Sequence, residues 1–133
     1  GTVETLMADT TSPASIVRSY LTLMEARDLH GAAAYLDPAF VITFPGGRTF
    51  RDLHDQVASS AGRFEFVRKT FDRIDVMEID DGAAVVYAFG TLAGRNLQGI
   101  DFAEIRFIDR FTLAMGLIVD QMVWNDLAES GVI

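Results

Sequence analysis

An aspartate stands among apolar residues between positions 102 and 114. Every second residue there belongs to one set: Ala103, Ile105, Phe107, Asp109, Phe111 and Leu113. This alternation predicts a strand with one buried face and one solvent-exposed face. Asp109 then lies on the buried face, where a carboxylate must be paired, hydrogen-bonded or protonated. Such an acid either donates or accepts a proton in a pocket, or it ties the sheet to a neighbouring polar group.

A tyrosine is the second candidate, because a buried phenol needs a hydrogen-bond partner. A helix is predicted from Pro13 to about Arg27, with Ser12 as its N-cap. Its apolar stripe consists of Ile16, Val17, Tyr20, Leu21 and Met24. Taken alone, Tyr20 is a core aromatic residue. Since Asp109 also needs a partner, Tyr20 is the predicted hydrogen-bond partner of its carboxylate.

The sequence lacks the usual residue patterns of metal-dependent and nucleophilic chemistry. His30 and His54 have no metal-binding spacing, no serine stands in a nucleophile elbow, and there is no cysteine. The glycines at 46 and 47 match no phosphate-binding motif and indicate a turn. We therefore expect neither a metal nor a cofactor. Asp101 has the same strand parity as Asp109 and is the best candidate for a second acid.

The composition predicts one globular domain with an acidic surface. The 133 residues are 50% hydrophobic and carry a formal charge of −8. Eleven basic residues are scattered along the chain without a run, which argues against nucleic acid and anionic membranes as partners. No apolar run approaches the roughly 20 residues that span a bilayer, and the absence of cysteine fits a cytoplasmic protein. Residues 1–11 lack a secretory pattern and are expected to be a flexible lead-in before a single domain at 12–130.

The remaining patterns predict two short helices and four long strands. Asp28 is expected to cap a helix from Leu29 to Leu36, followed by a strand over 40–44 and a turn over 45–47. A capping box at Thr49 predicts a helix that ends near Gly62. Strands over 63–79 and 83–93 join at a hairpin turn over 80–82, and two more, within 102–126, join at Gly116. This order predicts an α+β fold in which the helices cover one face of a curved sheet.

Three segments carry a resemblance to a known superfamily. They are IVRSY at 16–20, RDLHGAAAYL at 27–36 and FIDRFTLAMGLIVDQMVWND at 107–126. In order and spacing the chain resembles, over residues 12–128, the nuclear transport factor two-like superfamily, specifically its ketosteroid isomerase and SnoaL-like (polyketide cyclase-like) branch. The resemblance implies a cone-shaped, cystatin-like α+β barrel, in which a strongly curved antiparallel or mixed sheet wraps over three helices and a pocket opens between them.

The resemblance also implies roles for individual residues. Tyr20 matches the oxyanion-hole tyrosine of the isomerase, and Asp109 matches its protonated aspartate, an acid kept neutral by an apolar site. The aspartate that serves as general base in that enzyme is replaced by Phe44, which cannot move a proton. Asp101 is the remaining candidate for the base. The pocket is expected to be lined by Phe40, Phe44, Phe107, Phe111, Gln121, Val123 and Asn125.

Three functions are consistent with this sequence. The first is an isomerase, cyclase or dehydratase that acts on an apolar substrate with a carbonyl or phenol oxygen held by Tyr20 and Asp109. The second is a domain that binds a small apolar molecule without converting it. The third is a dimeric scaffold in which both residues are structural. Many members of the superfamily pair through the outer face of the sheet, and Met122 and Trp124 would suit such a homodimer contact.

Overall fold

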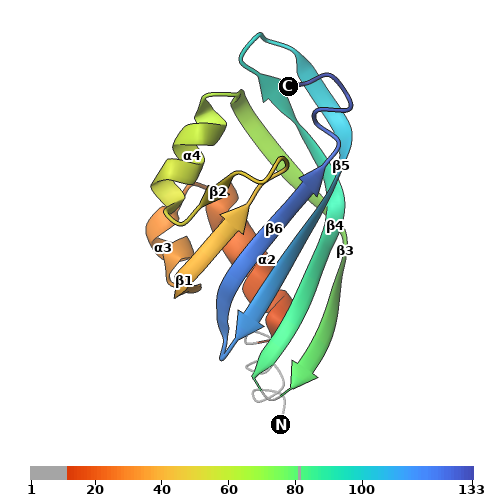
Figure 1. Cartoon of the computed structure of the whole chain (residues 1–133). Helices are drawn as coiled ribbons and strands as arrows, with labels where there is room; N and C mark the ends of the chain where they lie inside the picture. Colours follow the sequence, from red (N-terminus) through yellow and green to blue (C-terminus); the bar gives the residue numbers. More distant parts are fainter. Residues whose placement is uncertain (1–11, 81) are drawn as a thin grey trace.

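The computed structural model describes residues 12–80 and 82–133 (Figure 1). The predicted lead-in at 1–11 and Asp81 of the predicted hairpin turn lie outside the described residues. The helices are α2 (Pro13–Glu25), α3 (Leu29–Ala33) and α4 (Leu53–Ala61). The strands are β1 (Leu36–Thr43), β2 (Thr49–Phe50), β3 (Phe64–Asp80), β4 (Ala83–Asn96), β5 (Asp101–Ala114) and β6 (Leu117–Asn125).

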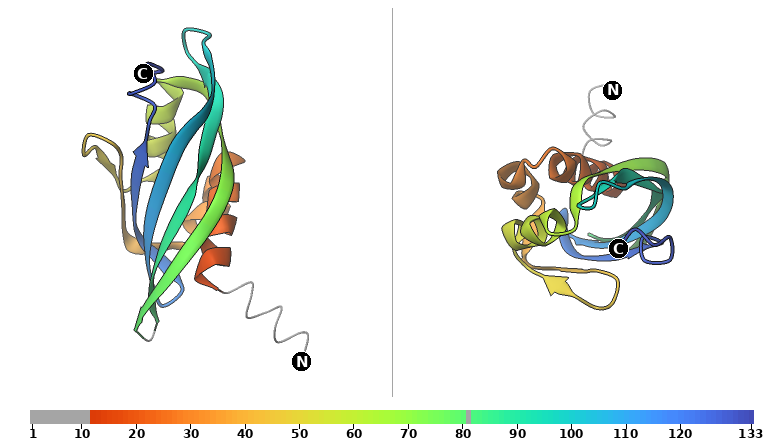
Figure 2. Two further views of the ribbon diagram at one scale, coloured as in Figure 1. Left: turned by 90° about the vertical axis from the view of Figure 1, so that its right-hand side faces the viewer. Right: turned by 90° about the horizontal axis from the view of Figure 1, so that it is seen from above.

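The described strands form one six-stranded mixed sheet in the order β2-β1-β6-β5-β4-β3. β1 and β6 are parallel, and every other pair of neighbours is antiparallel. The sheet curls without closing, and the helices lie along the open side of the curl (Figure 2). The predicted α+β class and the curved sheet beneath helices are confirmed. The core lies between the sheet and α2.

Two helices begin as the sequence predicts. Ser12 caps α2, with its hydroxyl accepting a hydrogen bond from the Ser15 backbone N–H at 3.2 Å. Asp28 caps α3 by accepting from Gly31 N–H at 3.0 Å. The whole apolar stripe predicted for the first helix is buried, which points Tyr20 toward the sheet.

The boundaries of several elements differ from the prediction. α3 ends at Ala33 rather than Leu36, because Leu36 pairs with Ile118 of β6 and starts β1. Pro38 lies at an irregularity of that pairing, where its missing N–H costs no ladder hydrogen bond. Thr49 belongs to β2 and is not a cap. Asp52 caps α4 instead, accepting from two backbone N–H groups.

A bulge in β5 reverses the predicted strand parity at its start. Glu104 has a positive φ of 58°, and the register with β4 shifts at the same point. The extra residue turns Phe102 inward and Ala103 outward, whereas Asp109 keeps its predicted inward position beyond the bulge. The expectation that Asp101 shares the face of Asp109 is therefore wrong.

Two glycines of β4 allow β3 to bend across the sheet. A Cβ atom on Gly90 would lie 1.9 Å from the carbonyl oxygen of Thr70, and one on Gly94 would lie 2.2 Å from that of Phe66. The register of β3 shifts close to both contacts. Only glycine permits so close an approach of two backbones, so the curl of the sheet depends on these positions.

Replacement of Gly90 by alanine should force β3 away from β4. We expect Gly90→Ala to lower the free energy of unfolding by about 2 kcal/mol or more, as an overpacked core does. Urea unfolding followed by circular dichroism measures the change. Gly62→Ala is the control, because φ there is −76° and the nearest atom to a new Cβ is 3.4 Å away. Equal midpoints for the two variants would contradict the close approach of β3 to β4.

Candidate functional site

Asp109 lies inside the curl, at the middle of β5. Its neighbours across the sheet are Ala88 on β4 and Val123 on β6, and its side chain has no exposed surface. The ammonium group of Lys69 donates a hydrogen bond to Asp109 Oδ2 and forms an ion pair with it. A buried carboxylate requires such a partner. The partner is thus Lys69, and not Tyr20 as the sequence suggested.

Lys69 reaches the carboxylate from the bent part of β3. It pairs with Leu92, between the two glycines at which β3 approaches β4. Its ammonium lies 4.9 Å from the centre of the Phe107 ring, which adds a cation–π contact. Its backbone N–H donates to Glu25 Oε2 on α2 at 3.4 Å. These contacts hold the ammonium over Asp109 while 25% of the lysine side chain stays exposed.

Tyr20 faces the same space from α2. Its ring packs edge-on against Phe40 and Phe111, with centroid distances of 6.4 and 6.3 Å, and the side chain is fully buried. Its hydroxyl finds no hydrogen-bond partner among the described residues. Burial and then the negative charge of Asp109 raise the pKa of Tyr20 above its ordinary value. The phenol therefore keeps its proton and remains a free donor.

A pocket of about 170 Å³ lies between α2, α4 and the sheet and includes both residues. Most of its wall is apolar. Four buried side-chain atoms on this wall have no hydrogen-bond partner in the described part of the chain: Tyr20 OH, Asp109 Oδ1, Gln121 Oε1 and Gln56 Oε1. Native proteins pair the large majority of such atoms. Their concentration at one pocket provides a free donor and several free acceptors to a bound molecule.

The structure brings most of the predicted site residues together. The lining includes Tyr20 and Asp109, and also Phe44, Phe107, Gln121, Val123 and Asn125. Phe40 and Phe111 lie behind Tyr20 and fix its ring. Asp101 is outside: it is exposed and pairs with Arg95 at 2.7 Å. The bulge at Glu104 turns Asp101 outward, and Asp101 also lies at the start of β5, where even the inward-facing Phe102 does not line the pocket.

Lys69 and Gln56 are pocket residues that the sequence analysis did not select. A pattern for Lys69 exists, since Val67, Lys69 and Phe71 alternate with outward residues in the same way as the residues around Asp109. A lysine at an apolar position of one strand and an aspartate at an apolar position of another together indicate a buried ion pair. Gln56 has no such pattern, because it follows the exposed polar residues His54 and Asp55 on a short helix and nothing in its spacing sets it apart from them.

Metal ligands do not gather in this part of the molecule. No group of three or more histidine, aspartate or glutamate side chains within 12–80 and 82–133 could hold a metal ion. Of the helices described, none is long and apolar enough to cross a membrane.

The arrangement can bind and polarise an oxygen atom. The hydroxyl of Tyr20 can donate to a carbonyl, enolate or phenol oxygen, and Asp109 Oδ1 can accept a proton or a hydrogen bond from the same molecule. Lys69 balances the charge of the carboxylate in both cases. Because the walls are apolar, these interactions are stronger than they would be in water.

Comparison with protein families gives one match. The model of the SnoaL-like domain family matches residues 17–121, a range that begins within α2 and ends within β6. No curated protein sequence matches significantly.

Solved structures share the fold at low sequence identity. An NTF2-like protein of unknown function from Burkholderia pseudomallei is 20% identical, with 88% of this chain and 92% of that chain covered and a TM-score of 0.72. TerC, co-crystallised with polyporic acid, is 17% identical, with 89% and 94% covered and a TM-score of 0.74. A Pseudomonas putida protein provisionally assigned as a polyketide cyclase is 17% identical, with 87% and 92% covered and a TM-score of 0.63.

Removal of the Tyr20 hydroxyl should stabilise the fold at neutral pH. Tyr20→Phe deletes a buried donor that has no partner, so we expect the free energy of unfolding to rise by about 1 kcal/mol. Because the pKa of Tyr20 is raised on folding, the folded state holds the phenol proton more tightly than the unfolded state, and the free energy of unfolding falls as the pH rises above 10. Wild type should therefore lose about 1.4 kcal/mol more per pH unit than Tyr20→Phe above pH 10.

Chemical denaturation at pH 7 and between pH 10 and 11 measures both effects. Tyr35→Phe makes the same chemical change outside the pocket and is the control. A marked loss of stability in Tyr20→Phe at pH 7 would mean that the hydroxyl has a structural partner.

Proposed function

The chain belongs to the SnoaL-like domain family, and from this premise we propose that it binds a small, largely apolar molecule with an oxygen at Tyr20 and Asp109. The observation that carries the proposal is the group of unpartnered polar atoms on the pocket wall. Leaving them unpaired costs stability. A ligand that accepts from Tyr20 and donates to Asp109 Oδ1 would satisfy two of them.

The ion pair favours one chemical role for Asp109. The matched aspartate of the isomerase donates its own proton, but a carboxylate that already accepts from Lys69 is better suited to accept one. In the proposed reaction Asp109 Oδ1 takes a proton from the carbon next to a carbonyl group, and Tyr20 donates a hydrogen bond to the enolate oxygen that forms. Phe44, at the position of the known base, contributes only an apolar wall.

This role gives a reaction class: isomerisation, cyclisation or dehydration of a substrate with a carbonyl or phenol group. The solved structures of similar fold support this class without fixing it. One is a provisional polyketide cyclase and another holds polyporic acid. A cyclised or rearranged product would require only that the same two groups return the proton and release the oxygen.

Binding without turnover is the second candidate function. It is favoured by the loss of the known base, because Phe44 at that position cannot move a proton. Conversion of ketone substrates, followed by mass spectrometry, distinguishes the two functions. An enzyme converts at least one substrate and loses this activity in Asp109→Asn, whereas a binding domain retains every compound unchanged.

A phenol probe tests the shared basis of both functions. We expect 4-phenylphenol to bind in the pocket, with its hydroxyl accepting from Tyr20 and donating to Asp109. Tyr20→Phe should weaken binding about tenfold, as loss of one hydrogen bond to a charged or strongly polarised group does. Isothermal titration calorimetry measures the affinity, and Tyr35→Phe should bind like wild type. Equal affinity for wild type and Tyr20→Phe would refute the placement of the ligand oxygen.

We further propose that two copies pair through the outer face of the sheet. Ile108, Met122 and Trp124 are exposed there, although large apolar side chains of this kind are commonly buried. Ile108 and Trp124 are direct neighbours across β5 and β6 and line a surface hollow of about 600 Å³.

Sedimentation velocity tests this pairing. A dimer is expected for wild type, and Trp124→Glu should shift it to monomer, because a charge would be buried in the contact. Leu97→Glu is the matched control, since Leu97 and Trp124 are each 49% exposed but Leu97 lies outside the hollow. A wild-type monomer would contradict the proposal.

A further inference from the structure

A second pocket opens directly beside the first. Its volume is about 330 Å³, and its wall comes from α4, the loop between β1 and β2, and the chain after β6. The two pockets share the residues Phe44, Gln56, Ser60, Phe64, Asn125 and Leu127. Ligand pockets for larger molecules measure roughly 300–1,000 Å³, so the first pocket alone is small. A ligand of more than about one ring would extend into the second.

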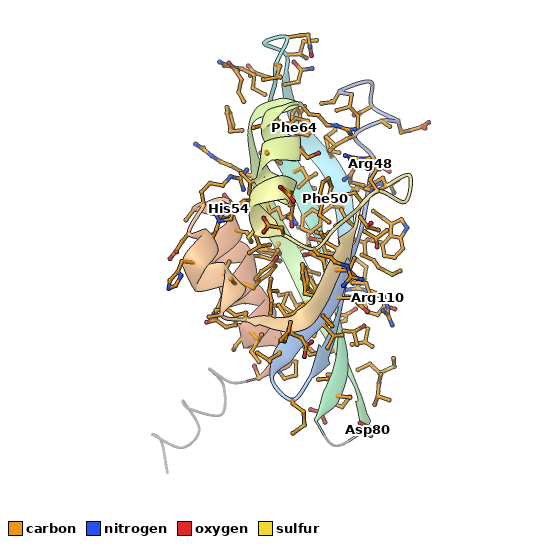
Figure 3. The ribbon with its side chains drawn as sticks, turned by 60° about the vertical axis from the view of Figure 1, so that its left-hand side comes forward. Arg48, Phe50, His54, Phe64, Asp80 and Arg110 are labelled. Atoms are coloured by element: carbon orange, nitrogen blue, oxygen red, sulfur yellow. The ribbon has the colours of Figure 1, made fainter. Side chains whose placement is uncertain are left out.

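The second pocket has a pair of arginines and no acidic side chain. Arg48 and Arg63 lie on its wall, and no aspartate or glutamate among the described residues does. Figure 3 shows Arg48 and Phe64 at the same end of the molecule, away from Asp80.

The hydrogen bonds of these arginines leave most of their donors available. Arg48 donates to Ser59 Oγ at 3.3 Å, and its guanidinium lies 5.6 Å from the centre of the Phe44 ring. Neither Arg48 nor Arg63 forms an ion pair within the described ranges, whereas Arg95 and Arg106 each hold an aspartate. A guanidinium carries five N–H donors in a flat fork.

Electrostatics around Arg48 favour an incoming negative charge. Partial burial and then the positive charge of Arg63 lower the pKa of Arg48 from its ordinary value. The lowered pKa reports that the charged form of Arg48 is penalised where it stands. An anion between the two guanidinium groups would remove the repulsion and replace lost hydration.

We propose that Arg48 and Arg63 bind a carboxylate group of the same molecule whose oxygen lies at Tyr20 and Asp109. This inference rests on the proposed function and adds the substrate class: an aromatic or polyketide-like acid with an apolar middle. The planar guanidinium fork matches a carboxylate in two parallel hydrogen bonds. Phe44 and Phe64 line both pockets and would contact the apolar part between the two polar ends.

Two probes that differ only in the acid test the inference. They are 4-phenylphenol and 4′-hydroxybiphenyl-4-carboxylic acid, titrated by calorimetry into the full chain at pH 7. We expect the acid to bind wild type about tenfold more tightly, the gain of a charge-assisted hydrogen-bonded pair. Arg63→Gln and Arg48→Gln should each remove most of this gain, measured as the ratio of the two probes' affinities for the same variant.

Control variants show whether the gain in affinity depends on the charge of these two arginines or only on the net charge of the protein. Arg51→Gln makes the same charge change at an exposed residue outside all three described pockets and should keep the full gain. Arg48→Lys should keep part of it, because a lysine retains the charge without the fork. A cooperative thermal unfolding transition shows that each variant is folded. If Arg48→Gln does not fold, Arg63→Gln still tests the inference, because the side chain of Arg63 is exposed.

The outcomes distinguish this inference from the proposed function. Equal affinity of wild type for the two probes, or a gain that persists in Arg63→Gln and Arg48→Gln, would overturn the carboxylate site. If Tyr20→Phe still lowers the affinity for 4-phenylphenol in that case, the proposed function is supported and the carboxylate site is not. Arginine-dependent binding of the acid that is insensitive to Tyr20→Phe would support the anion site while overturning the placement at Tyr20.

Discussion

The close approach of two backbones at Gly90 and Gly94 is the constraint on which the rest of this structure depends. At these positions the carbonyl oxygens of β3 occupy space that any side chain on β4 would fill. The bend that results carries Lys69, which stands between the two contacts, across the sheet to Asp109. Without the bend the ammonium group of Lys69 would not reach Asp109, and a carboxylate in the middle of β5 would be buried without its counter-charge.

The pocket is an exception to the satisfied hydrogen bonding of the surrounding core. The ion pair uses one oxygen of Asp109 and leaves the other free, and the Tyr20 hydroxyl beside it is also free. Both groups are held by rigid packing: Tyr20 between two phenylalanines, and Asp109 between two strands. Polar groups that are fixed in advance and unpaired lose little entropy when a ligand oxygen meets them, which is the general advantage of preorganised sites. The fold gives up stability at this point, and the proposed ligand would restore it.

Local patterns in the sequence predict the fold class, the buried face of the first helix and the inward position of Asp109, because each follows from periodicity within one element. The errors arise where a residue's surroundings come from elsewhere in the chain. The bulge at Glu104 inverts the parity of Asp101, and nothing in the alternation around it shows an extra residue. Leu36 becomes a strand residue because β6 lies beside it. The alternation around Lys69 predicts that it faces inward, but its contact with Asp109 depends on the bend in β3. That bend is caused by Gly90 and Gly94, which follow some twenty residues later in the chain.

The cation of the site is carried by an edge strand of the sheet. β3 is the last strand of the sheet, with β4 as its only strand neighbour, and its open side at Lys69 is met by Glu25 of α2. Strand edges and their hydrogen bonds open more readily than the centre of a sheet. If β3 moved away from α2 at this point, the ammonium group of Lys69 would move away from Asp109 with it. The charge balance of the pocket therefore depends on the docking of an edge strand against α2.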